Sequence, residues 1–460
     1  MSPLAFLAAF FPPDLRPSYL LALAPAVLET IGLSFGAMFL AFVISLPLGL
    51  FAALNLRGSR GLLLALGALR AIPDLTLAIV AVILFGIGPG AGLAALCVYY
   101  AAGMAKMFAD LLRTAPQAPL AALRAAGASR VQTALFGLLP LKRDDLLAFG
   151  AYEFECALRA SVIVGAVGGG GLGAELVGSL SAMDFPRVAT QILVLVLLAA
   201  GFDALAVRLR RHPGWLMALA PLGLAAAVAY GPRLMSIGHA AQVLGEMWPP
   251  KLPPEAWAAL PQRILETVWM AGAGTGGAVA AALVLGAAGA RNLAPVWIAW
   301  PVRRLMEAAR AVPEVVWGLL LITTSGIGPV AGAWALGVHS TGCLARLYAD
   351  ALENAPGAPQ AAIAATGASR FKVFAFATAP LTLAPIAAHS LFRFEWNLRM
   401  ATVLGVIGAG GVGQALYEAQ QLFFYRQMLA YVLITAVLVA LVDQASEALR
   451  RRRRLLQAVA

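Results

Sequence analysis

Residues 121–141 read AALRAAGASRVQTALFGLLPL, and residues 361–381 read AAIAATGASRFKVFAFATAPL. The two stretches lie 240 positions apart, and 10 of their 21 positions are identical. The same offset relates RAIPD at 70–74 to RAVPE at 310–314, and GIGP at 86–89 to GIGP at 326–329. An earlier pair, LETIGL from residue 28 and LETVWM from residue 265, lies 237 positions apart. Glycines, prolines and charged residues that recur at a nearly constant spacing predict two copies of one unit, residues 1–210 and 211–460.

Composition places both copies in a membrane. The chain of 460 residues is 61% hydrophobic and only 12% charged, whereas a globular protein carries about 25% charged residues. This excludes a disordered chain and a soluble single domain. Charge-free runs such as 30–56 and 75–105 exceed the roughly 20 apolar residues that a membrane span needs. We therefore expect an all-α polytopic membrane protein with about 11 transmembrane helices, about five in the first copy and about six in the second.

The expected spans lie near 30–55, 62–86, 90–112, 144–167, 187–207, 214–232, 265–289, 298–325, 328–351, 381–407 and 426–447. The helix at 214–232 is an extra leading span of the second copy, where the first copy has only the short stretch 4–11. Both copies then enter the membrane in the same orientation, as a parallel repeat.

Charge predicts the orientation. The net charge is +11, and the basic residues concentrate in short loops and in the C-terminal run 450–454. Positive loops face the cytoplasm. We expect a multi-pass protein of a bacterial inner membrane, with its N-terminus outside and its C-terminus cytoplasmic. We expect its excess of basic residues to lie at the interface with the lipid bilayer. No nucleic-acid partner is expected.

The two cytoplasmic loops carry the strongest functional pattern. Each has an Ala-rich helical stretch, then Gly127 or Gly367, then Ser129 or Ser369. Glycine suits a helix C-terminus, and serine suits the N-cap of the next helix. The pattern predicts a short, rigid helix–turn–helix outside the membrane, whose small side chains let a partner approach closely.

These loops resemble the coupling loop of type I binding-protein-dependent ABC importer permeases. That pattern has Glu-Ala-Ala, three residues, Gly, and then about nine residues to Leu-Pro. Both copies carry Ala in place of its Glu, so the salt bridge that this Glu would make with the ATPase is not carried over. The resemblance implies coupling loops over 113–141 and 352–381, which we call the docking loops. The implied ATPase-coupling residues are Ala121, Ala122, Gly127, Ser129, Arg130, Ala361, Ala362, Gly367, Ser369 and Arg370.

A later segment narrows the resemblance. Residues 392–405, FRFEWNLRMATVLG, are followed by GAGGVG at 408–413 and are similar to phosphonate-type permeases of this class. The family member is usually one copy that forms a homodimer, so this chain resembles a tandem fusion of two. The resemblance implies import of phosphonate or a related phosphorus oxyanion by alternating access. It also implies two ABC ATPase subunits on the cytoplasmic side and an external substrate-binding protein as partners.

Chemistry by the chain itself is not expected. No Gly-Lys pair occurs, so a Walker A loop is absent from the sequence, and ATP and Mg²⁺ would be bound by the partner ATPase. We expect a transport subunit without catalytic residues, cofactor or metal. The glycine runs 168–173 and 408–413 fit a dinucleotide motif formally, but each is followed by a new span. We interpret them as bent loops at the outer ends of pore helices.

Charges inside the spans form a second candidate site. Glu155 and Arg159 are four residues apart on one helix face, as are Glu395 and Arg399. They fit a structural ion pair inside the bundle, or arginines that help an anionic substrate along its path. Asn397 stands where the first copy has Ala157, so the two copies differ chemically here.

Other readings stay open. An ABC permease for phosphate, methionine or a quaternary amine would share the coupling loop. An ion-coupled secondary transporter would also show a repeat and intramembrane charges, but it would not need two matched docking loops. An intramembrane enzyme would need a convergent nucleophile or metal set, and none repeats in the sequence.

Overall fold

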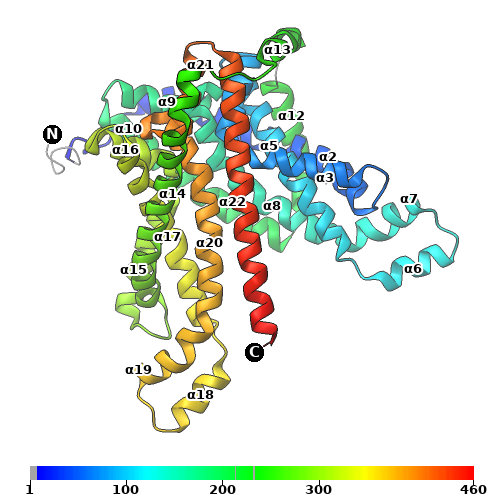
Figure 1. Ribbon diagram of the computed structural model, residues 1–460, viewed down its shortest axis with the longest axis vertical. Helices are drawn as coiled ribbons and strands as arrows, with labels where there is room; N and C mark the ends of the chain where they lie inside the picture. Colours follow the sequence, from blue (N-terminus) through cyan, green and yellow to red (C-terminus); the bar gives the residue numbers. More distant parts are fainter. Residues whose placement is uncertain (1–7, 213, 232–233, 460) are drawn as a thin grey trace. The chain divides into compact units, whose positions relative to one another are not determined.

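The computed structural model describes residues 8–212, 214–231 and 234–459. Throughout these residues the regular elements are helices, which confirms the all-α prediction (Figure 1). The chain divides into two compact units, Met1–Pro250 and Lys251–Ala460. Residues 1–7, which include part of the apolar stretch 4–11, lie outside the described residues.

The first unit begins with a long helix and ends with three short ones. Its α-helices are α2 (Pro17–Ala53), α3 (Ser59–Ala71), α4 (Asp74–Phe85), α5 (Pro89–Arg113), α6 (Gln117–Ala125), α7 (Arg130–Gln132), α8 (Leu139–Val164), α9 (Gly171–Ser181), α10 (Phe185–Arg211), α11 (Gly214–Ala218), α12 (Ala220–Tyr230) and α13 (Leu234–Met247). Two π-helical turns, Thr133–Leu138 and Gly165–Gly169, precede and follow α8.

The second unit repeats this order. Its α-helices are α14 (Pro254–Gly289), α15 (Val296–Ala311), α16 (Glu314–Ser325), α17 (Pro329–Glu353), α18 (Gly357–Ala365), α19 (Arg370–Val373), α20 (Ala379–Leu404), α21 (Gly411–Gln421) and α22 (Tyr425–Val459). The π-helical turns Phe374–Thr378 and Gly405–Ala409 flank α20, as their counterparts flank α8. The repeat seen in sequence is therefore a repeat of structure.

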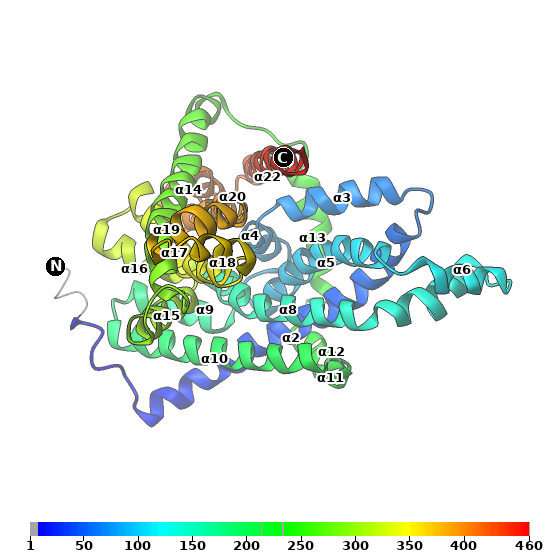
Figure 2. The ribbon, with the colours of Figure 1, turned by 90° about the horizontal axis from the view of Figure 1, so that it is seen from below.

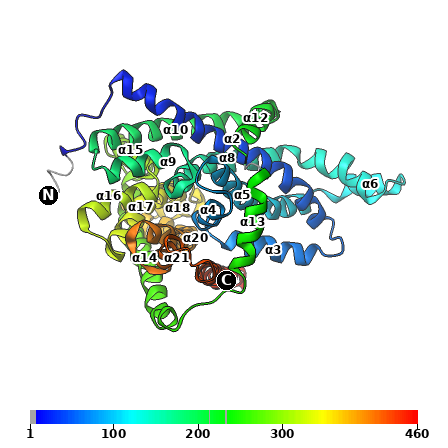
Figure 3. The same ribbon diagram turned by 90° about the horizontal axis from the view of Figure 1, so that it is seen from above.

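The compact units divide later than residue 210, because the helix expected to lead the second copy packs on the first. Helix α12 lies along α2 (Figure 3). A Cβ atom built on Gly36 of α2 would lie 3.0 Å from the backbone nitrogen of Ala227 on α12, so the missing side chain of glycine eases this close approach. The boundary of the duplication near residue 210 stays a prediction about the sequence repeat.

Fewer helices qualify as spans than the eleven expected. Within the described residues, six helices are long and apolar enough to cross a membrane, and two bent helix pairs raise this to eight. The expected single spans 62–86 and 298–325 both break before a proline. Ile72 and Val312 are extended, with ψ 124° and 123°, because proline disfavours a helical residue before it. Helix α12 has only 11 residues, and α17, interrupted by polar residues, is not among the qualifying helices.

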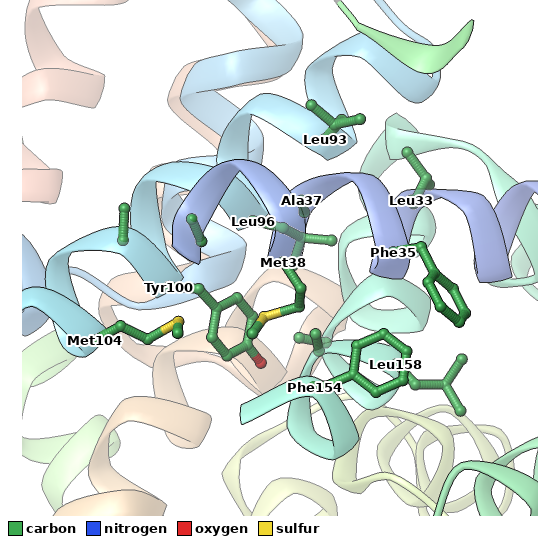
Figure 4. Close-up of a cluster of buried hydrophobic side chains, with 14 of the residues drawn as sticks. Leu33, Phe35, Ala37, Met38, Leu93, Leu96, Tyr100, Met104, Phe154 and Leu158 are labelled. Carbon is green, nitrogen blue, oxygen red and sulfur yellow. The ribbon is translucent and has the colours of Figure 1, made fainter. Parts of the chain in front are cut away.

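The core of each unit forms where its first long helix crosses the helix that precedes the docking loop. In the first unit these are α2 and α5, and Figure 4 shows Met38 of α2 beside Tyr100 of α5 among buried apolar side chains. Gly49 of α2 faces Phe108 of α5, and the equivalent Gly286 of α14 faces Tyr348 of α17. A Cβ atom on either glycine would approach that aromatic side chain's own Cβ to within 2.9 Å or less. The glycine–aromatic pair therefore sets the crossing distance in both units.

Candidate functional site

The first docking loop is a helix–turn–helix, as predicted. Helix α6 ends at Ala125, and Gly127 follows its C-cap with a φ of +90°, which favours glycine. The amide of Ala128 donates to the carbonyl of Leu123, and the amide of Gly127 donates to that of Arg124, which is the Schellman pattern. Ser129 then caps α7 in a full capping box with Gln132. The turn is thus fixed by local hydrogen bonds on both sides of the glycine.

The second docking loop has the same backbone and a weaker cap. Gly367 follows α18 with a φ of +77°. Ser369 has the backbone of an N-cap but makes no side-chain cap bond. Lys372 stands where the first loop has Gln132, and an ammonium group cannot accept the N-cap amide. The predicted helix–turn–helix is present in both loops, whose helices α6 and α18 are labelled in Figure 2. The capping box is present in the first loop and absent from the second.

Both loops present a small-residue turn beside exposed aromatic rings. The ten predicted coupling residues are all exposed. Phe136 is 74% exposed, and its repeat partner Phe376 is 71% exposed. In the first loop, Phe136, Leu123 and Gly127 line an open groove. Large apolar side chains held in solvent beside a rigid turn are typical of a surface that a partner covers.

A second repeated site joins three sequence motifs in the first unit. Glu29 and Thr30 of the LETIGL motif accept the amides of Gly171 and Leu172, at 3.1 and 2.7 Å. These amides open helix α9, which starts at Gly171 within the glycine run 168–173. The amide of Gly88, in the GIGP motif, donates to the carbonyl of Gly168 at 2.8 Å. We call this meeting point of residues 29–30, 86–89 and 168–172 the glycine junction.

The second unit builds the same glycine junction from residues 266–267, 326–329 and 408–412. Glu266 accepts the amide of Gly411 at 2.9 Å, and Thr267 accepts that of Val412 at 3.0 Å. The amide of Gly328 donates to the carbonyl of Gly408 at 3.1 Å. The bend expected at the glycine runs is present, since Gly168 and Gly408 have φ of +101° and +105°. The capping role of the Glu-Thr pairs was missed, although their repetition was visible.

The intramembrane arginines bind acids on another helix. Arg159 of α8 pairs with Asp203 of α10 at 3.4 Å, and Arg399 of α20 pairs with Asp443 of α22. These pairs tie the last two long helices of each unit together, whereas the expected pairing of each arginine with the glutamate four residues before it stays a prediction. Glu395 is buried, and the side chain of Glu155 lies outside the described part of the chain. A role of the arginines in the substrate path stays a prediction.

Asn397 belongs to a buried polar network of the second unit. It accepts from the Ser340 hydroxyl and donates to that of Thr275, each at 2.9 Å. Arg393 continues the network through Ser340, at 2.8 Å, to Glu314, at 3.5 Å. In the first unit the position of Asn397 is Ala157, in an apolar cluster. The difference between Asn397 and Ala157 was visible in the sequence. The members of the network that lie on three other helices could not be recognised there.

The sequence matches one protein family twice. The family is described as the binding-protein-dependent transport system inner membrane component, and residues 45–213 and 278–455 match it. The chain is similar to the phosphate-import permease protein PhnE of Mycolicibacterium smegmatis, with 30% identity over 438 residues, 90% of this chain and 82% of that one. It is also similar to the phosphite transport system permease protein PtxC of Stutzerimonas stutzeri, with 34% identity over 212 residues, 46% of this chain and 76% of that one.

Among solved structures, the inward-facing MetNI methionine ABC transporter is similar, with a TM-score of 0.41 and 19% identity. That likeness covers 44% of this chain and 99% of the other. The two family matches fall one in each half of the duplication and include both docking loops. The chain therefore belongs to the binding-protein-dependent transport inner membrane components and carries their domain twice.

Proposed function

We propose that this chain is the membrane permease of an ATP-driven importer for phosphonate or a related phosphorus oxyanion. The observation that carries the proposal is the pair of matched docking loops, each with an exposed phenylalanine beside a rigid glycine turn. The substrate class is supported by relatives named for phosphate import and phosphite transport. One chain would then bind two ATPase subunits, which hydrolyse ATP with Mg²⁺, and receive substrate from an external binding protein.

The orientation follows from the same proposal. Both docking loops face the cytoplasm, as does the C-terminus, while the N-terminus lies outside. The basic residues around the loops support this orientation, because positive loops stay on the cytoplasmic side. Docked ATPase subunits displace the loops as they close on ATP, and the permease alternates between outward-open and inward-open states.

Growth of a deletion strain tests the function. We expect the strain to fail on methylphosphonate or phosphite as sole phosphorus source, to grow on phosphate, and to recover with the wild-type gene. A Gly127→Asp plus Gly367→Asp variant should not restore growth, because both docking turns are altered. Gly58→Asp is the matched control, since Gly58 is also exposed with φ of +91° and open space around it, but lies outside the docking loops.

The outcomes separate the alternatives. Growth of the double variant at the wild-type rate would favour an ion-coupled transporter. Normal growth of the deletion strain on every phosphorus source would remove the substrate class but keep the permease. Uptake of methionine and of a quaternary amine by the same strains would then decide between the remaining ABC permease substrates.

A further inference from the structure

A buried arginine donates a hydrogen bond to a carbonyl at the C-terminal end of the first long helix of the second unit. Helix α14 ends at Gly289, and Arg303 of α15 donates from Nε to the Gly289 carbonyl at 2.8 Å. The same guanidinium forms an ion pair with Glu353, the last residue of α17. Glu353 also accepts the amide of Arg291 at 2.6 Å. Arg303 is only 8% exposed, so its charge depends on these two partners.

In the first unit, an arginine from a different helix binds the equivalent carbonyl. The counterpart of Gly289 is Ala52 of α2, 237 residues earlier. Its carbonyl accepts a hydrogen bond from Arg113, the last residue of α5, at 2.9 Å. Arg113 also donates to the side chain of Asn55 at 3.3 Å. Arg113 stands at the repeat position of Glu353, and Leu63 stands at that of Arg303. Each unit thus sets a guanidinium on the equivalent carbonyl, although its arginine differs.

These contacts lie between the docking loop and the helix that carries the Glu-Thr pair of the glycine junction in each unit. Arg113 and Glu353 are the last residues of α5 and α17 and lie at the start of the docking loops. The helices they hold, α2 and α14, carry the Glu-Thr pairs of the glycine junctions nearer their other ends. Thr30 and Ala52 are 22 residues apart on one continuous helix, which is roughly 33 Å at 1.5 Å per residue. A guanidinium bound to a carbonyl at a helix C-terminus also interacts favourably with the negative end of the helix dipole.

We propose that these guanidinium contacts transmit the displacement of each docking loop to α2 or α14, and through that helix to the glycine junction. Arg303 and Glu353 in the second unit, and Arg113 in the first, are positioning residues for energy coupling. The inference rests on the proposed function, because the displacement comes from a docked ATPase. We call the two sets of contacts the carbonyl clamps.

The surroundings of Glu353 favour its ionised form, which the ion pair with Arg303 requires. Burial alone would raise the pKa of Glu353, but the Arg291 amide and the Arg303 guanidinium lower it below its ordinary value. The ionised form of Glu353 is therefore favoured, and the ion pair to Arg303 requires that form. Charge-assisted hydrogen bonds of this kind are about twice as strong as neutral ones.

Hydrogen exchange of the full chain in complex with its ATPase tests the inference without a substrate. The readouts are peptides covering the glycine junctions, residues 165–173 and 405–413, with and without ATP plus vanadate. We expect nucleotide to change exchange at both junctions in the wild type. Arg303→Leu should abolish the change at 405–413 and keep it at 165–173. Arg113→Leu should do the reverse. The untouched unit is an internal control for folding in each variant.

The repeat offers a rescue. Glu353→Arg combined with Arg303→Leu gives the second unit the residues of the first, and Asn292 already stands at the position of Asn55. We expect this double variant to regain at least half of the nucleotide-dependent change at 405–413 that Arg303→Leu lost. Protection of 361–370 by the ATPase reports docking in every variant.

Two results would overturn the clamps. One is a wild-type complex in which nucleotide does not change hydrogen exchange at the junction peptides. The other is an Arg303→Leu variant that keeps the full nucleotide-dependent change in exchange at 405–413. A double variant that docks its ATPase but stays as impaired as Arg303→Leu would also contradict the repeat argument. Failure of the wild-type chain to bind any ATPase is a separate outcome, because it removes the proposed function itself.

Discussion

The hydroxyl of Thr30 accepts a hydrogen bond from the amide of Leu172 at 2.7 Å, across 142 residues of chain. The same hydroxyl donates to the carbonyl of Ala26. Helix α9 starts after Gly170, which has no side chain to cap it, so the cap comes from helix α2. Thr267 and Val412 repeat this relationship at 3.0 Å. A side chain of one helix therefore replaces a local cap that the glycine run cannot supply.

Thr30→Val tests the strength of this cap. Valine keeps the shape of threonine but cannot accept the buried Leu172 amide, so we expect a loss of about 1–2 kcal/mol of stability. Thermal unfolding of the detergent-purified protein measures it. Thr30→Ser, which keeps the hydroxyl, is the matched control and should lose less than half as much. Equal melting temperatures for the valine variant and the wild type would show that the bond contributes nothing.

Gly127→Ala tests the docking turn. No atom lies within 4 Å of a Cβ built on Gly127, so the only cost is the left-handed backbone, about 1–2 kcal/mol. Asparagine tolerates this region better than alanine, so Gly127→Asn should be milder. Retention of the ATPase on affinity-purified permease is the measurement. The order wild type, Asn, Ala is expected, and an alanine variant that retains as much ATPase as wild type contradicts it.

Phe136→Ser and Phe376→Ser test the exposed rings of the loops. Each ring stands in solvent in the permease alone, so its loss should leave the melting temperature unchanged. A ring buried in a partner interface contributes about 1–2 kcal/mol or more, so ATPase affinity should fall roughly 5- to 30-fold or more per substitution. Leu422→Ser, at a 61% exposed position outside the loops, is the control. Unchanged affinity for both phenylalanine variants would exclude the rings from the interface.

Asp443→Asn separates the structural role of Arg399 from a role in transport. The side chain of Arg399 is only 10% exposed, so removing its partner's charge should destabilise the protein by about 3 kcal/mol. Asp203→Asn should cost less, because Arg159 is 24% exposed. Unfolding temperatures of both variants check this order. A stable Asp443→Asn protein with an altered KM for uptake would instead place Arg399 in the substrate path.

Local chemistry allowed several features to be predicted from the sequence. The duplication is visible because both copies keep the same glycines, prolines and charges at a nearly constant spacing. The docking turns at Gly127 and Gly367 could be predicted because a helix end depends on residues within one turn of it. The bends at the glycine runs follow from the same kind of argument.

Contacts between distant segments could not be predicted in the same way. The sequence showed LETIGL, GIGP and the glycine run as three repeated motifs, but not that they meet at one junction. It showed Arg113 and Glu353 at one repeat position, but not that Arg303 replaces Arg113 on the equivalent carbonyl. The structure also breaks the expected spans 62–86 and 298–325 before Pro73 and Pro313.

By itself, the sequence determined two copies of a helical membrane unit and the turn that each presents to a partner. These features depend on hydrophobic length, on spacing along the chain and on hydrogen bonds within one turn. Only the tertiary structure decided which helix caps α9, which arginine holds α2 or α14, and on which unit α12 packs. Those choices depend on how closely helices approach, because a hydrogen bond between residues 142 positions apart forms only where glycines such as Gly171 leave room for the other backbone.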